Sequence, residues 1–526
     1  MAVEAIRLQN FMAFEDTDWI ELRPISLLFG KNSSGKSAII RALLLLRQSL
    51  YAPADESPLL FRSPDGFDFG DFNSVLHKRS DGKKADRQIG FQFRCRLDAN
   101  LEQRVRDEVD FRREHFNAKI AEIENQQRYF DLKLFFDFEK AGKVALSELA
   151  IICPWIEIDG ETEITIFAAE LLDWKRALEM QEKWWFWSDF FLDNQKNHTN
   201  DLWALLDIIT VVGFLPILKV GEFESPQGEP EMQNLKFVID LLEDFKKTIG
   251  AFLLSIAYLG PMRPEPRRTY AMDEMDRLRW EKKESGDFLR FLSGNADEAD
   301  FKKIDDRMKY LLLGDKLVVE RARKSENFDE RSILTQINVQ ESTDGEAFNL
   351  KDVGYGTSQV LPIVIQSVLA KKLAGTFVII EQPELHLHPS LQAAMADFFI
   401  DMIYKLVEIE ENRKVKLKRE KNNIHFLLET HSEHLLLRMR RRIAESSAGK
   451  YKKPKRDELS HFLNTSDLAI YFANRQNGTS TIEEINIGDF GDFLKIAEGF
   501  YDFFTDDLLE SAEMVRAKLI AQRKKG

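Results

Sequence analysis

Residues 30 to 37 read Gly30-Lys31-Asn32-Ser33-Ser34-Gly35-Lys36-Ser37, which completes the pattern GxxxxGKS. The apolar run Ile25 to Phe29 precedes this stretch, and the helix-forming segment Ala38 to Leu46 follows it. In this order of strand, loop and helix, backbone N–H groups wrap phosphate oxygens, the lysine reaches the β- and γ-phosphates, and the serine hydroxyl ligates Mg²⁺. The stretch predicts an α/β fold with a nucleotide site built by Gly30, Asn32, Ser33, Gly35, Lys36 and Ser37.

The bulk composition is that of a globular protein. The chain has 526 residues, of which 44% are hydrophobic and 31% charged, so we expect two lobes rather than one compact domain. No stretch approaches the ~20 uninterrupted apolar residues of a membrane helix, and Met1 to Glu4 lack a signal-peptide pattern. Only two cysteines are present. We therefore expect a cytoplasmic protein in a reducing compartment, with no membrane partner.

The charge pattern argues against broad coating of nucleic acid, because the net charge is -14. Two basic runs, Lys414 to Lys421 and Arg438 to Arg442, survive within this acidic chain. We interpret both runs as solvated helix faces or loops. Binding of nucleic acid stays open at this stage.

Turn signals and apolar patterns divide the chain into segments. An N-terminal lobe with the phosphate loop is expected over 1–98, and a β-rich extension with one helix over 99–170, where Phe130 to Glu139, Leu146 to Ile158 and Glu163 to Phe167 read as strands. The tryptophan-rich segment 171–254 predicts a helical insertion, and its aromatic cluster is more typical of a core or partner interface than of a base-stacking surface. A second lobe is expected over 255–475.

Three further motifs carry chemistry in the second lobe. The apolar strand Gly375 to Ile380 ends in Glu381, a carboxylate suited to Mg²⁺. Upstream, Gly354 to Ser358 open an apolar helix whose N-terminus can bind a phosphate. Downstream, His431 follows the strand Ile424 to Leu428, at the strand end where α/β sheets bind ligands.

Together, these motifs resemble the ATP-binding-cassette class of ATPase heads found in chromosome-maintenance, recombination-repair and overcoming-lysogenization-defect families. The stretch Glu381 to Pro389, EQPELHLHP, is more closely similar to bacterial AAA-family ATPases with a split cassette. The resemblance implies an α/β, ABC-type P-loop ATPase head, with a mixed sheet, an antiparallel β lobe and a helical insertion. The segment 476–526 resembles a small C-terminal domain often attached to such ATPases.

The resemblance also implies roles for individual residues. Lys36 and Ser37 would bind phosphate and Mg²⁺, and Glu381 would hold the water shell of the metal. His431 would sense the γ-phosphate. Gly354, Gly356, Thr357 and Ser358 would reach across a homodimer, or a higher homo-oligomer, to the γ-phosphate bound by the partner. ATP and Mg²⁺ are the expected cofactors, and ATP hydrolysis is the expected reaction.

One position departs from the family pattern. Gln382 stands where the catalytic glutamate usually follows the metal-binding acid. A glutamine can position water but cannot accept its proton, so we expect slow hydrolysis, or recruitment of Glu384 as the base.

Three functions are open on the sequence alone. The first is an ATP-gated head that controls a separately encoded effector, plausibly a nuclease, in anti-phage defence, as implied by the similarity to ATPase subunits of Septu-like, retron-associated and PARIS-like systems. The second is a repair or chromosome-maintenance ATPase that binds DNA directly. The third is a non-hydrolysing scaffold that binds ATP. The chain itself carries no nuclease signature, because no apolar strand after His431 ends in DxD.

Overall fold

A computed structural model describes most of the chain, in two compact units. The first unit comprises Met1–Leu22, Ser37–Leu254 and Gln476–Thr481, and the second comprises Arg23–Lys36, Ser255–Arg475 and Ile482–Gly526. The residues described are 1–52, 57–63, 66–78, 88–116, 119–120, 128–138, 144–154, 156–157, 164–171, 184–187, 206–212, 214–220, 230–263, 265–272, 297–323, 333–341, 345–370, 377–411, 414–449 and 461–500.

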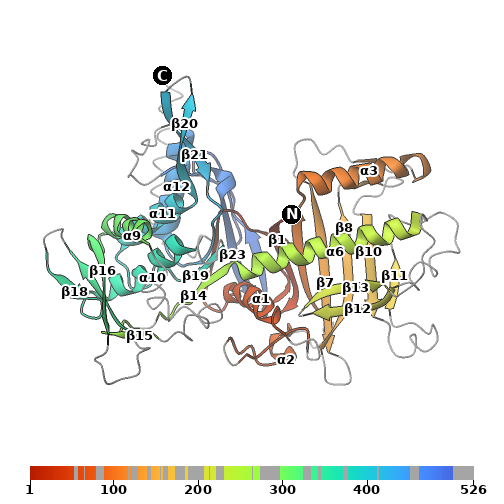
Figure 1. Cartoon of the computed structure of the whole chain (residues 1–526), viewed down its shortest axis with the longest axis horizontal. Helices are drawn as coiled ribbons and strands as arrows, with labels where there is room; N and C mark the ends of the chain where they lie inside the picture. The colour runs from red at the N-terminus through yellow and green to blue at the C-terminus, as the bar shows by residue number, and fades with distance from the viewer. Residues whose placement is uncertain are drawn as a thin grey trace. The chain divides into compact units, whose positions relative to one another are not determined.

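The first unit is built on an antiparallel sheet (Figure 1). Its strands run in the order β11-β10-β8-β7-β5-β1-β2, with β3 also paired to β1. Their bounds are β1 Ala2–Phe11, β2 Phe14–Asp16, β3 Ile20–Glu21, β5 Ile89–Arg96, β7 Tyr129–Phe138, β8 Val144–Cys153, β10 Ile164–Leu171 and β11 Trp184–Trp187. Smaller elements are α2 Phe72–Val75, α3 Ala99–Phe116, β6 Lys119–Ile120, β9 Ile156–Glu157, β12 Leu206–Val212 and β13 Leu215–Val220.

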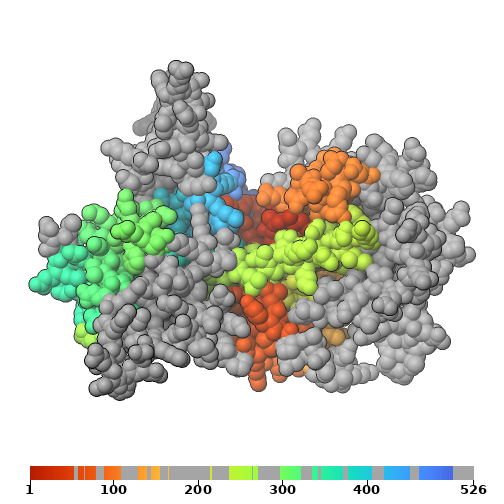
Figure 2. Space-filling model, viewed as in Figure 1, coloured from red at the N-terminus to blue at the C-terminus, as the bar shows by residue number. Residues whose placement is uncertain are grey.

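A long helix, α6 (Pro230–Leu254), packs against β1 and β13. Its buried side chains recur at the spacing of one helical face, namely Val238, Leu241, Leu242, Phe245 and Ile249. The opposite face carries the exposed pair Glu243 and Lys247, whose charged atoms lie 3.5 Å apart. Figure 2 shows this helix at the surface of the face drawn. The helix is therefore amphipathic, with one side available to solvent.

The helical interpretation of 171–254 is wrong at β11, β12 and β13. Within its described residues only α6 is helical, whereas Trp184–Trp187 pair with β10, and β12 pairs with β13 as an antiparallel hairpin. Aromatic and β-branched side chains suit a pleated strand, and here cross-strand pairing overrode the weaker helical pattern. By contrast, the expected helix after residue 99 and the strands near 130, 146 and 163 are confirmed.

The second unit is built on a parallel sheet, with strands in the order β23-β4-β22-β19-β14. Their bounds are β4 Ile25–Gly30, β14 Ile256–Leu259, β19 Phe377–Glu381, β22 His425–Glu429 and β23 Leu468–Gln476. The helices are α9 Glu298–Tyr310, α10 Tyr355–Leu369, α11 Pro389–Met402 and α12 Glu433–Ser447, and a 3-10 turn, η3, spans Thr465–Asp467. Helix α1, Lys36–Ser49, begins in this unit and continues into the first.

Strand β4 lies between β22 and β23, and every one of its residues is buried. A parallel strand covered on both faces needs a continuous apolar sequence, which Ile25-Ser26-Leu27-Leu28-Phe29 supplies. Because the strands are parallel, the carboxyl ends of β4, β22 and β19 share one edge. Parallel and antiparallel strands together give the mixed α/β fold that the sequence predicts.

Smaller sheets complete the second unit. Antiparallel strands run β15-β17-β16, with β18 on β17, over β15 Tyr270–Met272, β16 Lys316–Arg323, β17 Ile333–Gln340 and β18 Ala347–Asn349. Strand β20 (Tyr404–Glu411) pairs with β21 (Lys414–Lys421), and β25 (Asn486–Ile487) pairs with β26 (Phe493–Lys495). The basic run Lys414 to Lys421 is thus a strand, not the helix face or loop expected. Strand β24 (Thr479–Glu484) has residues in both units.

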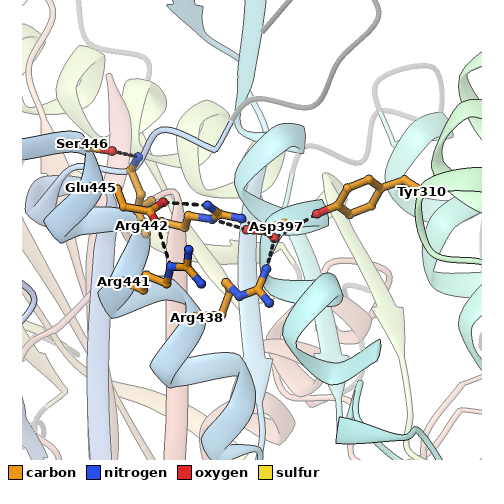
Figure 3. A network of polar contacts seen from close by, with 8 residues as sticks. Tyr310, Asp397, Arg438, Arg441, Arg442, Glu445 and Ser446 are labelled. Atoms are coloured by element: carbon orange, nitrogen blue, oxygen red, sulfur yellow. Dashed lines mark hydrogen bonds and ion pairs between the residues drawn. The ribbon is translucent and has the colours of Figure 1, made fainter. Parts of the chain in front are cut away.

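A buried carboxylate, Asp397, joins α9, α11 and α12 (Figure 3). It accepts hydrogen bonds from the Tyr310 hydroxyl at 2.9 Å, from Arg438 at 2.6 Å, and from Arg442 at 2.7 and 2.9 Å. Burial opposes ionisation of Asp397, but the bonds and charge of Arg442, with the charge of Arg438, lower its pKa. The run Arg438 to Arg442 is therefore not simply a solvated face, since two of its arginines hold this charge.

Residues 501–526, and the internal segments between the ranges given above, lie outside the described residues. Among the helices that are described, none combines the length and the hydropathy needed to span a membrane.

Candidate functional site

The phosphate loop joins β4 to α1 through a backbone that favours glycine. Gly30 has a φ of 144° and Gly35 a φ of 103°, and Ser33 also lies in the left-handed region. A Cβ on Gly30 would stand 2.3 Å from the carbonyl oxygen of Ala473 on β23. The turn therefore requires glycine at Gly30 both for its conformation and for the approach of the neighbouring strand.

Lys36 lies inside this loop, with its side chain only 3% exposed. Its ammonium donates to the carbonyl oxygens of Gly30 at 2.8 Å and Lys31 at 3.0 Å, and lies 3.9 Å from Glu429. Burial lowers the pKa of Lys36, and the carboxylates of Glu429, Glu384 and Glu381 oppose that shift. The lysine of the loop thus faces a set of acids from the ends of β22 and β19.

At the end of β19 the backbone turns sharply at Glu381 and Gln382, and several hydrogen bonds hold this corner. The Tyr258 hydroxyl, on β14, donates to Glu381 Oε1 at 2.6 Å. Gln382 adopts a φ of 48°, and its N–H donates to the Glu429 carbonyl at 2.7 Å. The Arg263 guanidinium donates to the carbonyl oxygens of Glu381 at 2.9 Å and Gln382 at 3.4 Å. A left-handed conformation is uncommon for a residue other than glycine, and these bonds hold it in place.

Glu384 is tied to the segment that follows β22. Its carboxylate accepts a hydrogen bond from the Thr430 hydroxyl at 2.7 Å and one from the backbone N–H of His431 at 2.6 Å. Burial raises the pKa of Glu384, while these hydrogen bonds and the Arg263 charge oppose the rise. The effect of burial on the pKa of Glu384 thus outweighs the opposing effect of its fixed donors.

His431 follows the end of β22, beside Lys36. Burial and the positive charge of Lys36 lower the pKa of His431 to about 4. Its imidazole is therefore neutral at pH 7 and carries one N–H donor and one acceptor. The next residue, Ser432, caps α12 by accepting from the Leu435 N–H at 3.1 Å, which fixes where the helix begins.

Helix α10 begins at the glycine motif. Gly354 is the N-cap residue and has no side chain, so none of the N–H groups of the first turn donates to an N-cap side chain. The Tyr355 ring meets the His386 ring edge-on, with centroids 4.8 Å apart, and a Cβ on Gly356 would lie 3.7 Å from Leu387. No hydrogen bond, ion pair or ring contact described for residues 354–358 reaches the phosphate loop. Thr357 is half-buried, whereas Ser358 is buried and donates its hydroxyl to the Tyr355 carbonyl.

The structure thus brings together Lys36, Glu381, Glu384 and His431, and Gln382 lies at the same strand end. Ser37 follows Lys36 directly, and Asn32 and Ser33 are exposed on the loop. The neighbouring histidines have other contacts: His388 caps α11, and His386 meets Tyr355.

Sequence reasoning missed three members of this site: Glu429, Tyr258 and Arg263. Glu429 could have been found, because it ends a buried apolar strand in the way that Glu381 does. The other two lie far from the motifs in the chain, in a segment whose sequence reads only as a linker. Their contacts depend on β14 pairing with β19.

Comparison with known proteins decides the family. The profile of the AAA ATPase domain matches residues 1–153 and 293–436, which is more than half of the chain. The chain belongs to the AAA ATPase domain family. It is therefore an ATP-binding P-loop ATPase, of a family that typically uses Mg²⁺. The two matched segments of this AAA ATPase hold the phosphate loop and the acids of β19 and β22.

Solved structures with a similar arrangement include heads of SMC proteins. The SMC head domain from Thermotoga maritima is 9% identical over 93% of this AAA ATPase and 100% of that chain, with a TM-score of 0.36. An Smc head from Pyrococcus furiosus, bound to the C-terminal domain of ScpA, is 9% identical over 92% and 96%, with a TM-score of 0.36. No curated protein matches the AAA ATPase chain.

The residues present fit a nucleotide with Mg²⁺. The buried Ser34 hydroxyl has no hydrogen-bond partner among the described residues, and α1 has no acidic residue in its first turn. A helix start of this kind favours a phosphate. Ser37 and Glu381 are the residues that would hold Mg²⁺. In the described part of the chain no three His, Cys, Asp or Glu residues cluster as a metal site.

Proposed function

We propose that the chain is an ABC-type ATPase head that closes as a homodimer on ATP, hydrolyses it slowly, and thereby gates a separately encoded effector. One observation carries this proposal: Lys36 of the phosphate loop lies near the acids at the ends of β19 and β22 and near the neutral His431. Such a set can bind a triphosphate, hold a divalent ion and contact the terminal phosphate.

Each residue of the cluster has a role in this proposal. Lys36 binds the β- and γ-phosphates, and Ser37 and Glu381 hold Mg²⁺, which neutralises phosphate charge when bound. Gln382 orients the attacking water, and Glu384 accepts its proton. His431, neutral at pH 7, donates its N–H to the γ-phosphate. Because Gln382 cannot itself take the proton, hydrolysis is slower than with a glutamate at that position.

The start of α10 supports a dimer. Gly354 and Tyr355 are exposed, and a Cβ on Gly354 would meet no atom within 4 Å. In our proposal the backbone N–H groups of Tyr355 and Gly356, with the Thr357 hydroxyl, bind the γ-phosphate held by the partner. The Thr357 N–H itself already donates to the Gly354 carbonyl at 3.0 Å. Ser358 keeps its place in the motif through its backbone, because its hydroxyl is already bonded within the helix.

The effector and the biological setting rest on resemblance to the ATPase subunits of anti-phage systems. The proposal names a nuclease as the effector class, because the described residues and the sequence offer no second catalytic centre of that kind. Loss of protection against phage by a Lys36→Ala strain, with its genetic neighbours intact, is the expected cellular outcome. Equal protection by Lys36→Ala would remove the defence role without touching ATP binding.

Mass in solution, with and without ATP, tests the dimer. Gly354→Arg fits the monomer, because the site is open and its φ is -55°. We expect ATP to double the mass of the wild type, and Lys36→Ala and Gly354→Arg to abolish the change. Gly250→Arg is the matched control, since Gly250 on α6 also has nothing within 4 Å of an added Cβ. A Gly354→Arg protein that still dimerises on ATP would overturn the trans arrangement.

A non-hydrolysing scaffold is the second candidate, and Gln382 is the residue that favours it. ATP turnover of the wild type and Gln382→Glu separates the two functions. We expect slow turnover by the wild type and a rate at least about tenfold higher for Gln382→Glu, equivalent to 1.4 kcal/mol. Zero turnover by both proteins, with ATP-dependent dimerisation retained, would favour the scaffold.

A further inference from the structure

Arg263 is a buried cation that leaves most of its hydrogen-bonding capacity unused within the described part of the chain. The residue is 5% exposed, and its Nη2 donates to the Glu381 and Gln382 carbonyls. Its Nε and Nη1 are buried and have no partner among the described residues. A buried guanidinium with unpaired N–H groups is unfavourable, so its place behind the Mg²⁺-side acid requires an explanation.

The contacts of Arg263 converge on one peptide corner. The left-handed Gln382 is held on one side by its N–H bond to Glu429 and on the other by Arg263. The corner sets the direction of the Glu381 side chain and of the Gln382 amide. Losing the Arg263 bonds would therefore loosen the Glu381–Gln382 backbone next to the position of the attacking water.

Among the described residues, Glu384 is the carboxylate whose charge acts on the Arg263 guanidinium. That charge opposes the fall to about 10 that burial causes in the pKa of Arg263. The same carboxylate is bonded to Thr430 and to the His431 N–H. Glu384 thus lies between Arg263, after β14, and the histidine after β22.

We propose that Arg263 is the positioning residue of this ATP site: its guanidinium fixes the Glu381–Gln382 corner and is the electrostatic counterpart of Glu384. This inference rests on the proposed function and adds to it a residue outside the family motifs. Arg263 affects the rate of ATP turnover through Gln382 and Glu384. Binding of ATP itself depends on the phosphate loop.

A split between turnover and affinity tests the inference. For Arg263→Met we expect kcat to fall at least about tenfold, as for removal of an outer-shell partner, while the Kd for ATP changes less than about threefold. Arg263→Lys keeps the charge and one donor, so we expect it to recover a substantial part of kcat. Arg267→Met, at an exposed arginine four positions on, is the matched control and should behave as the wild type.

A stability cycle covers the case in which turnover is too slow to measure. Unfolding midpoints of Arg263→Met, Glu384→Gln and the double variant should be non-additive, with the double variant less destabilised than the two separate losses predict. Additive midpoints, or an Arg263→Met protein with unchanged kcat, would overturn the inference. Lys36→Ala distinguishes failure of the proposed function from failure of this inference. If Lys36→Ala binds ATP normally, the proposed function is wrong. If Arg263→Met behaves as the wild type, only the positioning role of Arg263 is wrong.

Discussion

Tyr258 illustrates how a single hydroxyl prepares a metal-binding acid. Its bond to Glu381 Oε1, at 2.6 Å, occupies one carboxylate oxygen and limits rotation of the side chain. In metal sites, partners of this kind orient the ligand and are worth a substantial part of the affinity. The other carboxylate oxygen is then presented in a fixed direction.

Tyr258→Phe should therefore weaken the binding of Mg²⁺ together with ATP. We expect the Mg²⁺ concentration needed for half-maximal ATP binding to rise about tenfold, because the Glu381 carboxylate loses its fixed orientation. Titration of Mg²⁺ at constant ATP, with a fluorescent nucleotide, measures it. Affinity for ATP without Mg²⁺ serves as the control and should not change, and an unaltered Mg²⁺ titration would contradict the prediction.

His431 makes stability depend on pH in a definite direction. Its pKa in the folded protein is about 4, below the ordinary 6.5, so between these values the unfolded chain binds a proton here that the folded chain does not. The contribution of neutral His431 to the free energy of unfolding is thus fully present above pH 6.5 and is lost as the pH falls towards 4. We expect wild type to lose more stability than His431→Gln between pH 7 and pH 5 in urea unfolding. Equal losses would show that His431 titrates normally.

At the scale of elements, Asp397 is the ionic link between three helices. Its partners come from α9 and α12, and the carboxylate itself lies on α11. Breaking a buried ion pair by removing one partner leaves the other charge uncompensated. The mutual placement of α9, α11 and α12 therefore depends on Asp397.

Asp397→Asn should destabilise the protein by about 3–5 kcal/mol at pH 7, because Arg438 and Arg442 lose their counter-charge. The pKa of Asp397 is lowered, so its contribution is present above the ordinary value of 3.8 and is lost as the pH falls below it. The difference between wild type and Asp397→Asn in denaturant unfolding should accordingly shrink below about pH 4. Glu445→Gln, at the edge of the network, is the control, with a small effect expected.

Local and distant interactions explain what the sequence could predict. The phosphate loop, β4 and the strand that ends in Glu381 depend on neighbours in the chain, and all are confirmed as elements. Arg263 and Tyr258 acquire their contacts only when β14 pairs with β19, and Arg442 only when α12 packs on α11. The strand at Trp184–Trp187 likewise depends on β10. Patterns within a segment carry no information on such partners.

At the scale of the whole molecule, the two units interleave along the chain. The second unit takes β4 from the N-terminal region, while its other sheet strands come after residue 254. A cut at that point would leave β22 and β23 without the strand that pairs with both. Neither half of the chain therefore corresponds to a unit.

Residues 255–526 expressed alone should not fold cooperatively. Co-expression with residues 1–254 should restore folded protein, because β4 is then supplied in trans. Circular dichroism and urea unfolding of the fragment and of the co-expressed pair measure this. A cooperative transition in the isolated fragment would contradict the pairing of β4 as the central requirement of that sheet.

The position of β4 also has a consequence during protein synthesis. The ribosome completes Ile25–Gly30 early, but β22 and β23 emerge about 400 residues later, which at 5–20 residues per second is a delay of roughly 20–80 s. Through that interval an apolar strand with two bare edges is available to other nascent chains. Expression yield should thus respond to elongation rate and to chaperones that shield early segments, even though the finished protein buries β4 completely.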